Sequence, residues 1–310
     1  MDRSLLVALD GSVHSSRVVR YLGRLFTGQA EVRLHLVSLV SGVTAPAGSA
    51  WEELPPQLSP EGARRCQEAE HCLAAASEHL LQAGIPADRI SRQVQVAQMG
   101  VAADLLHLTR QGRHDALVLG RGGKSRIEEL LLGSVSASIL RKAEEVPLWI
   151  IDGEVDSRSF LVPVDGNVHT LKAVDHLAHM VSDHPSARIT LFRSSALLDQ
   201  ANPFGDKELT ACAALWGEDW CRQHLTCPDA LFHAPEQVLL EAGFPRERLR
   251  RLETRQGLYA SRQIIRQALM EDAGTIVMGR RPEDLRKGFL GSVSERVLAN
   301  AQDVAMWIVS

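Results

Sequence analysis

Two glycine turns in the first half of the chain could together hold a phosphate group. The sequence Gly120-Arg121-Gly122-Gly123 follows the apolar run 116–119, and nine residues later Gly133-Ser134 precedes a helical pattern. The first backbone N–H groups of a helix are unpaired, and the helix dipole is positive there, so this end attracts anions. Glycine lets a ligand approach the backbone closely. The spacing therefore indicates a phosphate-binding segment between a strand and a helix.

A degenerate copy of this pattern lies near the end of the chain. Gly279-Arg280-Arg281-Pro282 precedes Gly291-Ser292 after eight residues, one fewer than in the first half. Proline has no backbone N–H and fixes φ near −65°, so Pro282 cannot replace a phosphate-binding glycine. We therefore expect tight binding in the first half and weak or no binding at a second site, formed by Asp165, Gly279, Gly291 and Ser292.

The copy extends over the whole of each half. Asp10 and Asp165 are 155 residues apart, while Gly133 and Gly291, and Trp149 and Trp307, are each 158 apart. A stable offset of this size indicates the duplication of one domain rather than an array of short repeats. We predict domains at 1–153 and 157–310, with the boundary in the polar stretch 152–158.

Strands and helices alternate along each half. In the first half we predict strands at 5–9, 32–39, 93–97, 116–119 and 148–151. Helices are expected at 13–26, 61–83, 102–110 and 135–142, and a long loop at 40–60. The second half is expected to repeat this order, with strands at 161–164, 189–192, 249–254, 275–278 and 305–309. Continuous apolar strands between helices predict an α/β fold with a parallel sheet covered on both faces.

The composition excludes several classes of function. A net charge of −4 with 23% charged residues does not favour nucleic acid or an anionic membrane as partner. No apolar run approaches the length of a membrane span. The N-terminus leads directly into a strand, which leaves no room for a signal peptide. The five cysteines form no C-x-x-C pair. We expect a cytoplasmic protein with no metal site of its own.

Three features together are specific to one family. They are Asp10 at the end of the first strand, the Gly-x-x-Gly-x9-Gly-Ser signature that ends at Ser134, and a terminal strand after Val146-Pro147. The chain resembles a tandem universal stress protein, with two such domains fused in one polypeptide. The resemblance implies two Rossmann-like domains of the adenine nucleotide alpha hydrolase type, each with a five-stranded parallel sheet between helices.

The resemblance also implies an ATP site in the first domain, with or without Mg²⁺. Asp10 would bind the polar edge of the nucleoside, the backbone of Leu36 at the end of the second strand would meet adenine, and the glycine segment would surround ribose and phosphates. The corresponding residues are Ala8, Leu9, Asp10, Leu36, Leu119, Gly120, Arg121, Gly123, Gly133, Ser134, Val135 and Ser136.

Each of these residues also has a purely structural interpretation. Asp10 before Gly11-Ser12 is a common turn or helix cap, and Ser134 could be an ordinary N-cap. The agreement of the two copies favours a ligand site. The function expected is that of an ATP-binding regulatory module in a stress response, acting on an unknown protein partner. A slow ATP hydrolase and a scaffold that binds no nucleotide are the alternatives, and no catalytic residue is assigned.

An apolar strand at the edge of a sheet is expected to be paired or covered, because an exposed edge strand promotes aggregation. The strands at 148–151 and 305–309 are such strands, and the resemblance implies that they meet in an internal pseudo-dimer. We therefore predict that Trp149 and Trp307 lie at or near a contact between the halves. Whether the chain also forms a homodimer stays open.

Overall fold

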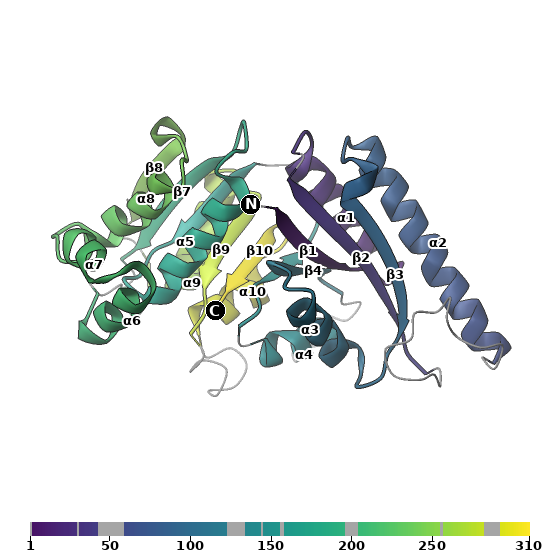
Figure 1. Cartoon of the computed structure of the whole chain (residues 1–310). Coiled ribbons are helices and arrows are strands. Elements are labelled where there is room, and N and C mark those ends of the chain that lie inside the picture. Colours follow the sequence, from purple (N-terminus) through teal and green to yellow (C-terminus); the bar gives the residue numbers. More distant parts are fainter. Residues whose placement is uncertain are drawn as a thin grey trace. The chain divides into compact units, whose positions relative to one another are not determined.

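The structure of the chain is a computed structural model that describes residues 2–29, 31–42, 59–122, 134–143, 145–155, 158–195, 204–254, 257–281 and 292–310. The chain forms two compact units, Met1–Asp156 and Ser157–Ser310. In each unit, strands alternate with helices, and five strands form a parallel sheet that helices cover on both faces (Figure 1). The predicted α/β fold class is therefore confirmed.

The first unit begins with a strand and alternates strictly from there. Its elements are β1 (Arg3–Ala8), α1 (Val13–Phe26), β2 (Val32–Val40), α2 (Pro60–Gln82), the short helical turn η2 (Ala87–Arg89), β3 (Ile90–Val96), α3 (Val101–Gln111), β4 (Ala116–Gly120), α4 (Ser134–Lys142) and β5 (Leu148–Ile151). α1 begins where the hydroxyl of its N-cap Ser12 accepts the backbone N–H of Ser15. β5 is buried along its whole length, as expected for a strand with both faces covered.

The strand order of the first sheet places β1 at its centre. The order is β3-β2-β1-β4-β5, and every pair in it is parallel. Ala8, the last residue of β1, pairs with Val37 of β2 and with Leu119 of β4. Helices α1 and α2 cover one face of the sheet, and α3 and α4 cover the other.

The second unit repeats this sheet strand for strand. Its elements are β6 (Ser159–Pro163), α5 (Val168–Val181), β7 (Arg188–Ser194), α6 (Asp206–Trp216), α7 (Glu218–His224), α8 (Ala230–Glu241), the turn η3 (Arg246–Arg248), β8 (Leu249–Thr254), α9 (Ala260–Met270), β9 (Thr275–Gly279), α10 (Val293–Asn300) and β10 (Ala305–Val309). The strand order is β10-β9-β6-β7-β8, so β6, the first strand of this unit, lies at the centre of its sheet as β1 does in the first unit.

The two units differ in the connection between their second and third strands. The first unit crosses over through the single long helix α2, whereas the second uses α6, α7 and α8. The expectation that the second half simply repeats the first is therefore wrong at this point. Glycines break the helical run, since Gly205 and Gly217 are the N-cap residues of α6 and α7. Acidic residues follow each glycine, where the helix dipole favours them.

Each unit buries one tryptophan of its last strand in its own core. Trp149 stacks on Phe26 with ring centroids 6.2 Å apart. Trp307 makes edge contacts with Phe160 at 5.4 Å and with His176 at 5.9 Å. Both indole side chains are fully buried. That they lie at or near a contact between the halves stays a prediction.

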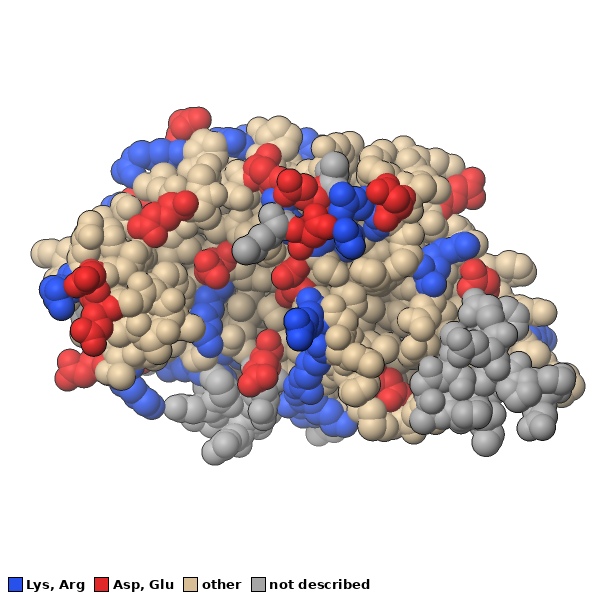
Figure 2. Space-filling model, in the orientation of Figure 1, with Lys and Arg blue, Asp and Glu red and all other residues tan. Residues whose placement is uncertain are grey.

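Charged side chains of both signs are intermixed on the surface. Figure 2 shows Lys and Arg beside Asp and Glu over the face in view. In the second unit, Arg251 is paired with Asp229 and the buried Glu236, and Arg250 lies 2.5 Å from Glu271. Across the described ranges, the helices lack the combination of length and apolarity that a membrane-crossing segment requires.

Candidate functional site

The candidate site lies where the direction of the strand order reverses in the first unit. β1 has β2 on one side and β4 on the other. The connection from β1 to β2 runs through α1 on one face of the sheet, and the connection from β3 to β4 runs through α3 on the other face. Asp10 follows the carboxyl end of β1, and Gly120 is the last residue of β4. Parallel α/β sheets bind ligands in the crevice that forms at such a switch point.

A pocket of about 240 Å³ occupies this crevice. The predicted site residues that line it are Ala8, Leu9, Asp10, Leu119, Gly120, Val135 and Ser136. The lining residues that the sequence analysis did not assign to the site are Ser12, His14, Ser15, Val37, Leu39, Val101, Leu105 and Gly122. The structure therefore brings the end of β1, the end of β4 and the start of α4 to one cavity.

The Asp10 carboxylate is fixed by the turn that starts α1. Its Oδ1 accepts the Ser15 hydroxyl at 2.7 Å and the Ser12 backbone N–H at 3.0 Å. Burial opposes the ionised form, but the hydrogen bonds from Ser12 and Ser15 outweigh it and lower the pKa of Asp10. The group is thus an anionic acceptor at neutral pH. Both of these hydrogen bonds go to Oδ1, which leaves Oδ2 as the oxygen for a ligand.

Gly120 is needed because α1 approaches the end of β4 closely. A Cβ at this position would lie 2.7 Å from the Cβ of His14 and 2.9 Å from its carbonyl carbon. The Nδ1 atom of His14 is buried and has no hydrogen-bond partner in the described part of the chain. Ser136 is buried and donates its hydroxyl to the Gly120 carbonyl at 3.4 Å. This bond ties the first turn of α4 to the end of β4.

Apolar side chains form a further part of the lining. Leu39 comes from β2, and Val101 and Leu105 come from the first turns of α3. The turn into α3 is fixed by the buried Asp104, whose carboxylate accepts the backbone N–H groups of Gln98 at 2.7 Å and Met99 at 3.1 Å. The wall offers a flat aromatic ring apolar contact.

Two predicted residues lie elsewhere. Leu36 is buried in the middle of β2, which continues to Val40, so its placement at the end of the strand is wrong. Arg121 is buried, does not line the pocket, and forms an ion pair with Asp152 at 3.1 Å. Ser134 is the first residue of α4, while Gly123 and Gly133 lie outside the described residues.

The corresponding residues of the second unit are engaged with their own neighbours. Asp165 repeats the turn of Asp10, since its Oδ1 accepts the Thr170 hydroxyl at 2.6 Å. Its Oδ2, however, lies 3.5 Å from Nη2 of Arg281. Ser292 is the N-cap of α10 in a capping box with Glu295. A Cβ at Gly279 would lie 2.3 Å from the His169 carbonyl oxygen, and Gly291 lies outside the described residues.

Within the described ranges, no three His, Cys, Asp or Glu side chains are grouped so that they could hold a metal ion. Among the described residues that line the pocket, Asp10 supplies the carboxylate, and this part of the lining resembles a site for an organic ligand.

The family model for the universal stress protein family matches residues 1–152 and 157–306. A universal stress protein from Archaeoglobus fulgidus DSM 4304 is similar over 100% of this chain and 97% of its own, with 17% identity and a TM-score of 0.63. A functionally unknown protein from Pseudomonas aeruginosa PAO1 is similar over 99% of this chain and 92% of its own, with 16% identity and a TM-score of 0.54. These two matches show a shared fold.

A third solved structure is a universal stress protein in complex with cAMP. It is 23% identical to this chain over 48% of this chain and 94% of its own, with a TM-score of 0.33. No curated protein matches the chain.

Proposed function

Because the chain belongs to the universal stress protein family, we propose that its first unit binds ATP and that the protein acts as a nucleotide-responsive regulatory module in a stress response. The observation that carries this proposal is the Asp10 carboxylate. It is ionised, its Oδ1 is held by the turn into α1, and it lines a pocket at the switch point of the sheet.

The nucleoside is proposed to bind between Asp10 and the apolar wall. Oδ2 of Asp10 can accept a hydrogen bond from a hydroxyl or amino group, and Leu39, Val101 and Leu105 can cover a base. Val37 and Leu39, rather than Leu36, are the residues of β2 that line the pocket, and Val37 lies next to Ala8 in the sheet.

The phosphates are proposed to bind at the other end of the pocket. Gly122, Val135 and Ser136 line the pocket, and the start of α4 offers the N–H groups and positive dipole end that stabilise anions. Gly123 and Gly133 bracket the connection between these residues in the sequence. Mg²⁺, if it accompanies ATP, would be held by the phosphates, since no group of three carboxylate, His or Cys side chains in the described part of the chain could hold it.

Regulation would act through the connection between β4 and α4. A ligand that binds Gly122 and the start of α4 favours the conformations of this connection that can reach the phosphates. Such a ligand shifts the population only by its difference in affinity between the conformations. The proposed partner is a protein that recognises the surface of this connection in one of its conformations.

Hydrolysis of ATP is the second function to be tested. It requires a positioned water and, in most enzymes that transfer phosphoryl groups, a metal held by carboxylates. In the described part of the pocket, Asp10 supplies the carboxylate, and the proposal assigns this group to the nucleoside and not to a metal. We therefore propose binding without rapid turnover, which a measurement of phosphate release over many equivalents of ATP would test.

Calorimetric titration of the full chain tests the site. Asp10→Asn keeps the oxygen that the turn uses and removes the anionic acceptor, so we expect ATP affinity to fall by about tenfold or more. Asp165→Asn is the matched control, because Arg281 already occupies that carboxylate. It should leave the affinity unchanged.

Adenosine separates the hydrogen bond of Asp10 from the effect of its negative charge. Asp10→Asn removes a negative charge that repels the phosphates of ATP, whereas adenosine has no phosphates. Asp10→Asn should therefore weaken adenosine at least as much as ATP. Equal affinities of the wild type, Asp10→Asn and Asp165→Asn would contradict the proposed site, and a wild-type chain that binds neither ligand would favour the nucleotide-independent scaffold.

A further inference from the structure

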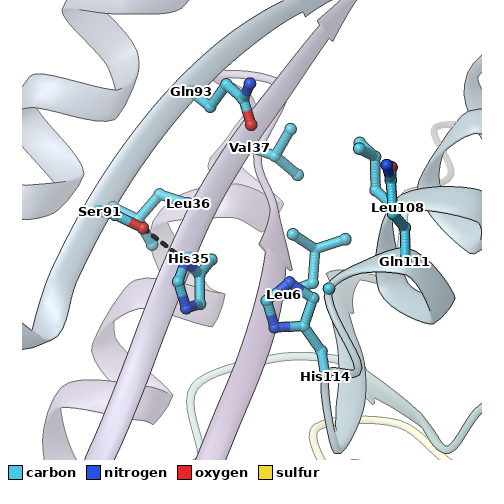
Figure 3. Close-up of a pocket in the computed structure, with 10 residues that line it drawn as sticks. Leu6, His35, Leu36, Val37, Ser91, Gln93, Leu108, Gln111 and His114 are labelled. Atoms are coloured by element: carbon cyan, nitrogen blue, oxygen red, sulfur yellow. Dashed lines mark hydrogen bonds between the residues drawn. The ribbon is translucent and has the colours of Figure 1, made fainter. Parts of the chain in front are cut away.

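The first unit contains a second pocket that the proposed ATP site does not use. It has a volume of about 200 Å³ and lies between β1–β3, the end of α3 and the turn before β4 (Figure 3). The cavity borders the candidate ATP pocket, because Val37 lines both. We call it the histidine pocket, after His35 and His114, whose ring centroids are 4.7 Å apart.

The walls of the histidine pocket are apolar, and its rim is polar but uncharged. Leu6, Val37 and Leu108 form the walls, and the first two are buried. Ser91, Gln93 and Gln111 form the exposed rim. The described lining residues include no Lys, Arg, Asp or Glu. Hydroxyl and carboxamide groups can both donate and accept hydrogen bonds, so the rim suits a ligand that does the same.

Hydrogen bonds hold both imidazole rings in place. Nδ1 of His35 lies 2.6 Å from the hydroxyl of Ser91, as the dashed line in Figure 3 shows. Nδ1 of His114 lies 2.7 Å from the hydroxyl of Ser4. Among the described residues, Nε2 of either ring carries no hydrogen bond. Each ring therefore keeps one polar atom for a further partner.

The charge state of the rings favours an uncharged ligand over an anionic one. Burial, and to a lesser degree the neighbouring His35, lowers the pKa of His114 to about 4, although Asp115 opposes the shift. Burial and Arg33 lower the pKa of His35 as well. Both imidazoles are neutral at pH 7, so the rings themselves offer no positive charge to an acid.

Gly112 leaves the space that His114 occupies. A Cβ at this position would lie 2.3 Å from Nε2 of His114, although the backbone, with φ −75° and ψ −6°, would accept any residue. The glycine is therefore needed for the imidazole ring and not for the end of α3. A single added methyl group would displace the ring and fill space beside Nε2.

We propose that the histidine pocket binds a small uncharged molecule with a flat apolar body and a group that both donates and accepts hydrogen bonds, such as a primary carboxamide. The flat body lies against the apolar walls, and the polar group meets the imidazoles and the rim. This site is separate from the ATP site, and it does not depend on ATP binding.

Benzamide and benzoate are suitable probes because they share one shape and differ in charge. In the full chain with ¹⁵N-labelled histidine, His35→Gln and His114→Gln assign the two ring signals. Benzamide should shift both signals saturably near pH 7.5, and benzoate should bind about tenfold more weakly. Equal binding of the two probes, or no shift of either ring, would overturn the proposal.

Gly112→Ala should weaken benzamide about tenfold or more, because the methyl group enters the space beside His114. His107→Gln, an exposed position on the same helix, is the matched control and should bind as the wild type does. Saturating ATP should leave the shifts in place. Their loss would place benzamide in the candidate ATP pocket and overturn the assignment, as would unchanged binding by Gly112→Ala.

Discussion

Nη2 of Arg281 lies 3.5 Å from Oδ2 of Asp165. The equivalent oxygen of Asp10 takes no part in the two hydrogen bonds that Ser12 and Ser15 donate to Oδ1. Both aspartates use Oδ1 in the same turn. The ion pair is about half exposed, so its contribution to stability is at most about 1 kcal/mol. Its effect is instead to compete with a ligand for the second oxygen.

The first prediction is that one chain binds one ATP. The second unit has Arg281 on its aspartate, Ser292 engaged in a capping box, and Pro282 in place of a glycine. Calorimetry should give a stoichiometry close to one. Gly133→Val should abolish binding because its side chain blocks the backbone approach to phosphate, whereas Gly291→Val should change the affinity little. Gly123→Val should act as Gly133→Val does.

Two equivalent sites, or a loss of binding with Gly291→Val alone, would show that the functional half is wrongly assigned. Circular dichroism of each variant checks that the fold persists. Arg281→Ala is a further control. It frees Asp165 but restores neither the capped serine nor the missing glycine, so the stoichiometry should stay close to one.

The second prediction separates the two glycines that line the ATP pocket. Gly120→Ala places a Cβ 2.9 Å from the carbonyl carbon of His14, so strand and helix must move apart. We expect a loss of about 1–3 kcal/mol of unfolding free energy. Gly122→Ala meets no described atom within 4 Å and should change stability by less than about 0.5 kcal/mol. Urea unfolding midpoints at constant slope measure both.

Gly279→Ala in the second unit should be as destabilising as Gly120→Ala, because its Cβ would lie 2.3 Å from the His169 carbonyl oxygen. If Gly120→Ala and Gly122→Ala proved equally stable, the close approach of α1 to β4 would not be what requires glycine. A weaker ATP affinity in Gly122→Ala at unchanged stability would assign this glycine to the ligand.

Sequence periodicity predicts most of the elements because the apolar runs are short and bounded by polar turns. The strand 148–151 and the helix 13–26 are found at the predicted residues. The connection from β7 to β8 is the main error, because an exact repeat predicts one long helix there and the structure has α6, α7 and α8. Gly205 and Gly217, each followed by acidic residues, were the available signals of separate helices.

The sequence predicts those residues of the candidate site whose position depends on a local turn or helix start. It does not predict the residues that come together only when distant segments pair. Asp10, Gly120 and Ser136 follow from a strand end, a close turn and a helix start. Arg121 could not be placed from the sequence, because its partner Asp152 approaches only when β5 pairs with β4. The same holds for His35 and His114, which come together through the pairing of β1 with both β2 and β4.

The third prediction concerns acid stability. The unfolded chain protonates its histidines near pH 6.5, whereas folded His114 does so only at about 4. Acid therefore favours the unfolded chain, and the stability that neutral His114 contributes is fully present above pH 6.5 and lost as the pH falls toward 4. His35, whose pKa is also lowered, loses stability in the same direction.

The change that tests this is His114→Gln, compared with His107→Gln on the exposed face of α3. The unfolding free energy from urea titrations should fall less steeply between about pH 6.5 and pH 4 in His114→Gln than in the wild type, with the difference below about 1.4 kcal/mol per pH unit because one proton is involved. His107→Gln should follow the wild-type slope. Parallel slopes for all three proteins would mean that His114 is protonated as readily in the folded chain as in the unfolded one, and the neutral state that the histidine pocket requires would then be lost at mildly acidic pH.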